Sequence, residues 1–314
     1  GRIEAVRSSL EEELADAFGL SRWYFKGEQL GKERGTVLAA IASSIAAEIF
    51  ESTPHIFSEL INREDPSSNS VKARKDLMYR MVTHAHRERL GYDGFPADAG
   101  LYFTVLQEPG LHRPRGEEGW SFGEPNISPR GVLMERFWFR TKNHVLDGSK
   151  VTSLTDLYEM WRLPPFGLRS GVMPVLSLAF FLAHRSSLAL YVDGVFTPDM
   201  SEAVVDEWTL DPKRIAFQNV EASQDQTKFV SAISRSISSQ TQVDIGDQPL
   251  DAARGLVGMV ISLPGWTKRT STVSPLAQDV RAMLLKANDP HKVLFADLPT
   301  LLNAKKADEL VAKL

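Results

Sequence analysis

The sequence has no cysteine among its 314 residues. Disulfides, thiolate nucleophiles and cysteine-ligated zinc or iron–sulfur sites are therefore excluded. Long hydrophobic runs are also missing, since the longest apolar stretch covers only residues 172–183. That run is shorter than the ~20 residues that a membrane-spanning helix requires. Because no export leader is recognisable either, we expect a cytoplasmic protein without a membrane partner.

The chain also lacks the excess of basic residues that a general nucleic-acid coat would need. Its formal net charge is −4 and its pI is about 6.0, so only a local basic stripe could meet phosphates. The 43% hydrophobic and 24% charged residues are ordinary values for folded domains, which argues against gross disorder. A chain of this length suits two or three domains.

Helical periodicity predominates along the chain. We predict a mainly α, multi-helical fold with a central winged-helix-like unit that carries a short β-hairpin. The expected domains are a helical domain (1–148) with a Gly/Pro-rich loop at 108–131, a winged-helix-like domain (149–221), and a linker followed by a C-terminal helical domain (222–314).

The first domain is predicted to hold several helices. The apolar, small-residue segment 37–50 is expected to be a helix buried on most sides. A short helix is expected from Pro54 to near Asn62-Arg63, and a longer helix over 71–90 after a serine-rich cap. In the Gly/Pro-rich loop, Trp120 and Phe122 are the side chains expected to hold the loop together.

The central unit follows a recognisable order of elements. Ser153 is a plausible N-cap for a helix reaching Arg162, and a second helix is predicted over 171–184. The Asp193-Gly194 dipeptide is a strong tight-turn signal within a hairpin over 188–197. Two helices followed by such a hairpin is the order of a winged helix.

A winged helix raises the hypothesis of DNA binding, which the side chains of the second helix oppose. Residues 171–184 contain only two polar side chains, Ser177 and His184, whereas a helix that reads base edges presents polar groups. Burying such a helix among its neighbours gains roughly 1.5–3 kcal/mol for each large side chain. We therefore predict a packing or communication module.

Motifs that would carry catalysis or bind a cofactor are incomplete. Gly27 and Gly31-Lys32-Glu33 resemble a phosphate loop, but the spacing is one residue short and Glu33 replaces the hydroxyl that holds magnesium. His84 and His86 are two apart, so they would point to different sides of a helix. The paired Glu117 and Glu118 fit solvated loop charges. We predict no metal site, catalytic residue or cofactor within this chain.

The segment 71–89 is basic, with six cationic residues against two acidic ones. It could follow a phosphate backbone, or it could be a solvated face or be paired with the acidic segment 10–16. Candidate nucleic-acid contacts come from this segment and the nearby loop. They are Lys72, Lys75, Arg80, Arg87, Arg113 and Arg115.

Several phrases resemble one large family. They fall within residues 54–77, 101–113, 157–176 and 270–299, and the third contains Pro164-Pro165-Phe166-Gly167-Leu168-Arg169. These phrases are similar to the helical and winged-helix region downstream of the P-loop domain in very large bacterial ATPases associated with anti-phage defence loci. Ser58 stands where the family pattern has asparagine.

The resemblance implies a regulatory region that couples nucleotide state to engagement of a partner or nucleic acid. ATP and magnesium would bind elsewhere in the parent protein, with Arg63 or Arg74 as sensors of a neighbouring nucleotide site. The implied partners are other domains of the same polypeptide or further copies of it, and DNA or RNA. The sequence opens and closes in helical patterns without an initiator methionine, so we expect a piece of a larger polypeptide. The alternative function is direct nucleic-acid binding through the segment 71–89.

Overall fold

The computed structural model describes residues 2–20, 24–29, 36–116, 119–147, 150–220, 224–241, 248–287, 289–303 and 309. Helices predominate within these residues and the strands are short, which confirms a mainly α fold class. The chain forms two compact units, Gly1–Thr53 with Pro164–Gly167, and Pro54–Leu163 with Leu168–Leu314. Among the described helices, none is both long enough and apolar enough to span a bilayer.

The first unit begins with a helix and a small hairpin. Helix α1 (Arg2–Leu20) is followed by strands β1 (Tyr24–Phe25) and β2 (Glu28–Gln29), which pair antiparallel. Lys26 and Gly27 form the turn, with φ angles of 50° and 84°. The glycine of the phosphate-loop-like sequence is therefore a hairpin-turn glycine. Gly31-Lys32-Glu33 lies outside the described residues.

Helix α2 (Thr36–Ile49) corrects one expectation. Its small and aliphatic residues predicted burial on most sides, yet between Ala39 and Ile49 only Ile41 and Ile45 are even half-buried. The first unit consists of little more than α1, the hairpin and α2, so it has too few residues to cover an apolar helix all round.

Helix α3 (Ser68–Thr83) starts as predicted and ends early. The Ser67 hydroxyl accepts a hydrogen bond from the Ser70 amide at 3.3 Å. The expected continuation to Leu90 is wrong. From Thr83 to Arg89 no large apolar side chain is available to bury, and two residues in left-handed conformation, Arg89 and Leu90, place the Leu90 side chain in the core instead.

The short helix expected from Pro54 is also absent, because tertiary contacts hold this segment in an irregular conformation, with turns only from Glu59 onward. Ile61 is fully buried, and the Arg63 carbonyl accepts a hydrogen bond from the Gly171 amide at 3.0 Å. After α3 come a short turn at Glu88–Gly91, helix α4 (Ala97–Leu101) and a π-helical turn.

The Gly/Pro-rich loop contains a hairpin that the sequence did not reveal. Strands β3 (His112–Pro114) and β4 (Trp120–Phe122) pair antiparallel, and helix α5 (Pro129–Leu146) follows. The rings of Trp120 and Phe122 lie 5.3 Å and 4.8 Å from the His112 ring. The expectation that these aromatic residues hold the loop together is confirmed.

A four-stranded antiparallel sheet lies at the centre of the second unit. Its order is β5-β8-β6-β7, from strands β5 (Val151–Ser153), β8 (Ile215–Asn219), β6 (Leu188–Val192) and β7 (Val195–Phe196). The β6–β7 hairpin turns at Asp193-Gly194, as predicted. The central strand β8 was not expected from the sequence.

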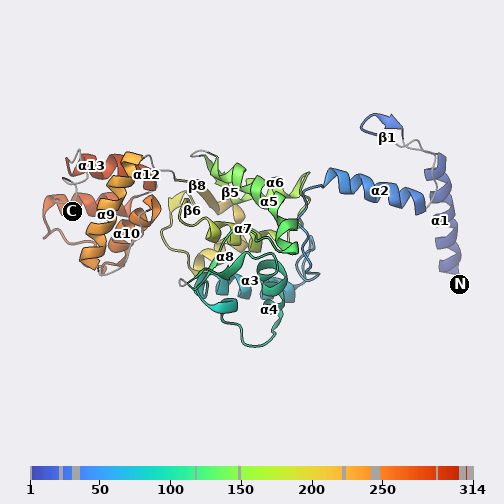
Figure 1. Ribbon diagram of the computed structural model, residues 1–314, viewed down its shortest axis with the longest axis horizontal. Coiled ribbons are helices and arrows are strands. Elements are labelled where there is room, and N and C mark those ends of the chain that lie inside the picture. The colour runs from blue at the N-terminus through green and yellow to red at the C-terminus, as the bar shows by residue number, and fades with distance from the viewer. Residues whose placement is uncertain are drawn as a thin grey trace. The chain divides into compact units, whose positions relative to one another are not determined.

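Helices pack against this sheet (Figure 1). Helices α5 and α6 (Leu154–Arg162) contact its strands, and rings of α7 (Met173–Ala183) and α8 (Glu202–Leu210) lie beside Phe217 of β8. The Ser153 hydroxyl caps α6 by accepting from the Asp156 amide at 3.0 Å, which confirms the predicted start. Helix α8 lies between β7 and β8 in the chain.

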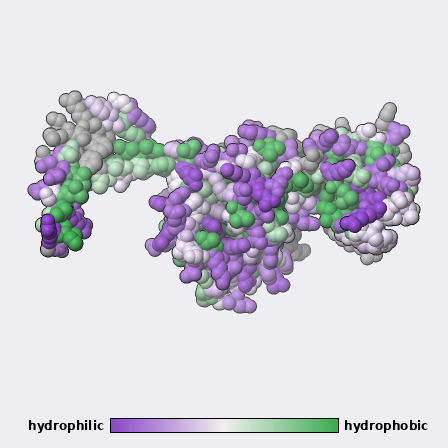
Figure 2. Space-filling view, turned by 180° about the vertical axis from the view of Figure 1, so that it is seen from behind, coloured by the Kyte–Doolittle hydropathy of each residue, from purple (hydrophilic) through white to green (hydrophobic). Residues whose placement is uncertain are grey.

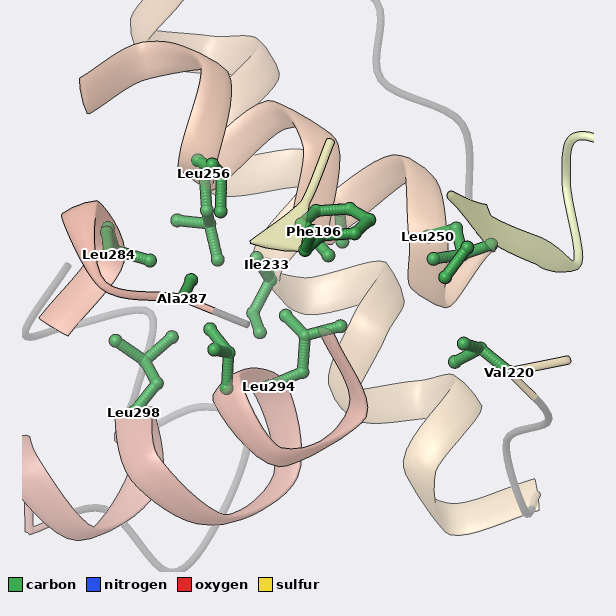
Figure 3. Close-up of a cluster of buried hydrophobic side chains, with 14 of the residues drawn as sticks. Phe196, Val220, Ile233, Leu250, Leu256, Leu284, Ala287, Leu294 and Leu298 are labelled. Carbon is green, nitrogen blue, oxygen red and sulfur yellow. The ribbon is translucent and has the colours of Figure 1, made fainter. Parts of the chain in front are cut away.

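The C-terminal part is helical, as expected. Its elements are α9 (Gln224–Thr241), α10 (Pro249–Ser262), α11 (Pro275–Leu285), α12 (Pro290–Lys292), a π-helical turn at Val293–Asp297, and α13 (Leu298–Leu301). Figure 3 shows Ile233, Leu256 and Leu294 from three of these elements pointing toward one another beside Phe196 of β7. The C-terminal helices therefore share a core with the sheet hairpin.

Candidate functional site

Helix α7 is the most deeply buried helix described. Every residue from Met173 to Phe181 is buried, among neighbours that include α3, α6 and β4. This confirms the prediction that the second helix of the central unit packs inside the protein. A helix enclosed in this way cannot insert into a DNA groove.

Ser177, a polar residue in the middle of α7, joins three helices. Its hydroxyl donates to the Pro174 carbonyl at 3.1 Å and accepts from the Trp208 indole at 3.0 Å. The Tyr158 hydroxyl lies 3.0 Å away and donates to the same oxygen, because the Ser177 proton is already used. Burial raises the pKa of Tyr158, so this hydroxyl stays protonated. We name Ser177, Tyr158 and Trp208 the α7 joint.

Arg74 and Gly171 connect α3 to the start of α7. The Arg74 guanidinium donates to the Gly171 carbonyl at 3.0 Å, and burial lowers its pKa. A Cβ on Gly171 would lie 2.2 Å from the Ile61 carbonyl oxygen, so only glycine permits this approach. Of the two arginines expected to sense nucleotide, Arg74 is thus part of the packing around α7. The Arg63 side chain is exposed.

The cations of α3 are mostly paired within the protein. The Lys75 ammonium lies 2.7 Å from the Asp206 carboxylate of α8, which also accepts from the Tyr79 hydroxyl. The Arg80 guanidinium lies 4.4 Å from the Tyr92 ring centre and 3.7 Å from the Asp98 carboxylate. Lys75 and Arg80 therefore have acidic partners, Asp206 and Asp98, within their own unit, and the pairing with the segment 10–16 stays a prediction.

Of the other cations that were candidates for nucleic-acid contacts, one is hydrogen-bonded within the protein and three are exposed. The Arg113 guanidinium donates to the carbonyls of Gly110, at 2.6 Å, and Glu124. Lys72, Arg87 and Arg115 are exposed. The β3–β4 hairpin brings Arg115 toward Arg87, because Arg115 pairs with Gly119 and the next amide, Trp120, donates to the His86 carbonyl.

His112 is a site residue that the sequence analysis missed. It is fully buried, with its Nε2 2.8 Å from the Ala85 carbonyl and its Nδ1 3.0 Å from the Tyr102 hydroxyl. Nε2 therefore donates while Nδ1 accepts, and burial lowers the pKa of His112. The histidine joins the end of α3 to the β3–β4 hairpin. A histidine directly before Arg113-Pro114 carried no periodic signal.

A cavity in the C-terminal helical part lies away from the α7 joint. It measures about 340 Å³ and is lined by α10, α11 and the loop between them, including Leu263, Leu276 and Arg281, whose guanidinium donates to the Thr267 and Thr270 carbonyls. Within the described residues, no three His, Asp or Glu side chains gather closely enough to hold a metal ion. The His84 Nδ1 is engaged by the Thr83 hydroxyl at 2.7 Å. Glu117-Glu118 lies outside the described residues.

No protein-family model, curated protein or solved structure matches this chain significantly.

Proposed function

We propose that this chain is a non-catalytic coupling region of a very large bacterial P-loop ATPase of the kind associated with anti-phage defence loci. Its parent protein would bind ATP and magnesium outside these residues. The observation that carries the proposal is the burial of α7, because it makes the central unit an internal joint between helices. The family assignment rests on the sequence phrases described above.

We further propose that the central unit is a winged helix with an insertion. The chain order α5-β5-α6-α7-β6-β8 and the strand order β5-β8-β6 suit that architecture. On this interpretation β7 and α8 are inserted within the wing. Helix α8 then folds back, so that Trp208 reaches Ser177 of the second helix.

Coupling is supported by the directional bonds that converge on α7. Tyr158 of α6 and Trp208 of α8 make specific hydrogen bonds to α7, and Arg74 of α3 makes one to Gly171, two residues before α7. Packed elements with such bonds move together, because sliding one past another would strand buried polar groups. The Arg63 carbonyl accepts a hydrogen bond from the Gly171 amide, just before α7. A displacement of Arg63 would therefore be passed through α7 to α8.

The test uses the full-length polypeptide that contains this chain. We expect a Walker A motif in it outside these residues, and amide exchange of α7 and α8 that differs with and without ATP. Ser177→Ala should reduce this nucleotide dependence while ATP binding persists, whereas the exposed Ser186→Ala in the same unit should leave it unchanged. ATP hydrolysis by the 314-residue chain alone, or exchange unaffected by ATP, would contradict the proposal.

Direct nucleic-acid binding is the second candidate, favoured by the exposed Arg87 and Arg115 beside the β3–β4 hairpin. Labelled duplex titrated at two salt concentrations decides between the functions. Binding that weakens steeply with salt, and whose salt slope falls in Arg87→Glu plus Arg115→Glu, would establish it. Arg269→Glu plus Lys286→Glu is the matched control, since both side chains are exposed on the C-terminal helical part.

A further inference from the structure

Helix α1 presents an apolar stripe to solvent. Four large aliphatic side chains, spaced three, four and four residues apart, are exposed to 85%, 63%, 56% and 47% (Figure 2). They are Ile3, Val6, Leu10 and Leu14. At about 100° per residue they fall within about 80° of the helix circumference and extend over about 16 Å. A stripe of this kind in a helix of 19 residues is the pattern of a helix–helix interface.

The charges of α1 are divided between its two ends. The N-terminal half carries Arg2 and Arg7 with the single acid Glu4, while the C-terminal half carries only acids. The acids of the C-terminal half are Glu11, Glu12, Glu13 and Asp16. A helix with opposite charges at its two ends is complementary to itself when reversed. Parallel pairing would instead place acids against acids.

We propose that α1 pairs antiparallel with α1 of a second copy of this chain. The two stripes then face each other about a twofold axis near Ser8 and Ser9, with Ile3 opposite Leu14 and Val6 opposite Leu10. This arrangement does not depend on the proposed function, because it needs neither nucleotide nor a particular parent protein.

The residues that border the stripe fit the reversed pairing on both sides. On the helical wheel, Arg7 and Glu11 lie on one side of the stripe, and Arg2 and Glu13 on the other. In an antiparallel pair, like sides face each other. Arg7 therefore meets Glu11 of the second copy, and Arg2 meets Glu13 of the second copy. In a single copy, Arg7 pairs with its own Glu11 at 2.9 Å, an exposed contact that can be exchanged for the intermolecular one.

Charge reversal tests both the interface and its direction. Sedimentation of the 314-residue chain should show a concentration-dependent dimer, which Leu10→Asp abolishes and Ser8→Glu, on the opposite side of the helix, preserves. Arg2→Glu plus Arg7→Glu should abolish it, and so should Glu11→Arg plus Glu13→Arg. All four substitutions together restore opposite charges across an antiparallel pair, so dimerisation should return. A parallel pair would stay repulsive in the quadruple variant.

The absence of cysteine permits a second test with single spin labels. Ser9→Cys and Asp16→Cys place labels at similar angles from the stripe. At 1.5 Å rise per residue, antiparallel pairing gives an axial offset between copies of about 2 Å for position 9 and about 23 Å for position 16. Parallel pairing gives equal distances at both positions.

Three results would overturn the proposal. The first is a chain that remains monomeric at all concentrations that can be reached, which would leave α1 to another segment or partner. The second is a dimer that survives Leu10→Asp. The third is equal label distances at positions 9 and 16.

Discussion

Replacing Ser177 with alanine removes one oxygen atom from the α7 joint and leaves the shape of the core nearly unchanged. The Trp208 indole and the Tyr158 hydroxyl, each 3.0 Å from that oxygen, both lose their acceptor. Leaving a buried donor without a partner costs about 1–3 kcal/mol. We therefore expect Ser177→Ala to lower the free energy of unfolding by about 2–6 kcal/mol, a large part of the roughly 5–15 kcal/mol of a typical domain.

A double-mutant cycle makes this expectation sharper. In the unaltered chain, Tyr158→Phe removes one hydrogen bond and should cost about 1 kcal/mol. In the Ser177→Ala background the same change removes an unpaired hydroxyl, so it should stabilise the protein by about 1–3 kcal/mol. The sign of the effect reverses only if the two hydroxyls are bonded to each other in the folded protein.

The assay is urea unfolding followed by tryptophan fluorescence, with Ser186→Ala as the control for an exposed serine of the same unit. Trp208 lies fully buried beside the altered site and serves as a reporter. A loss below about 0.5 kcal/mol in Ser177→Ala would refute the reasoning, since surface substitutions reach that size. Equal effects of Tyr158→Phe in both backgrounds would refute it as well.

Further predictions concern a glycine, a histidine, the basic residues and α1. Gly171→Ala should destabilise the protein by about 1–3 kcal/mol, because its Cβ would lie 2.2 Å from the Ile61 carbonyl oxygen. Gly258→Ala, with open space around it in α10, should stabilise the protein by about 0.5–1 kcal/mol, and the same urea unfolding assay measures both glycine variants. Burial lowers the pKa of His184 to about 4, so the unfolded chain binds a proton more readily than the folded one. The free energy of unfolding should therefore fall by roughly 3 kcal/mol between pH 6.5 and 4. If it does not change with pH in either the unaltered chain or His184→Phe, this prediction is wrong. If the coupling proposal holds, Arg87→Glu plus Arg115→Glu leaves any duplex binding unchanged. Independently of that proposal, Leu10→Asp should abolish self-association.

Local signals in the sequence predicted much of the central unit. Ser153 marks a helix start because its hydroxyl satisfies a free amide, and Asp193-Gly194 marks a hairpin because both residues accept positive φ angles. The burial of α7 followed from its composition, and Ser177 was one of only two polar side chains in the predicted helix 171–184. Such a residue needs partners, but the sequence gives no means of naming Tyr158 and Trp208.

Features determined by distant contacts were not predictable in the same way. Strand β8 is five residues long, and both of its partners, β5 and β6, are far from it in the chain. The early end of α3 depends on Leu90 reaching the core, and the role of His112 depends on Ala85 and Tyr102. For helix α2 the sequence predicted burial, but most of its described side chains are exposed. The composition of a helix shows which side chains it could bury, but not which elements lie beside it. The three-domain division expected from linkers and composition stays a prediction.

The pairing of β6 with β8 shows where a deletion could shorten this chain. Val192 and Ile215 are register partners, and the Asp193 amide donates to the Arg214 carbonyl at 2.8 Å, so the segment 193–214, which contains the edge strand β7, begins and ends at one point of the sheet. A two-residue turn could join β6 to β8 there, but the deletion would also remove the edge strand β7 and Phe196, which packs in the C-terminal core. Removing the segment would uncover Ser177 and the face of α7 that Trp208 now shields. In this molecule, a side chain of the segment 193–214 therefore helps to keep the apolar helix α7 away from solvent.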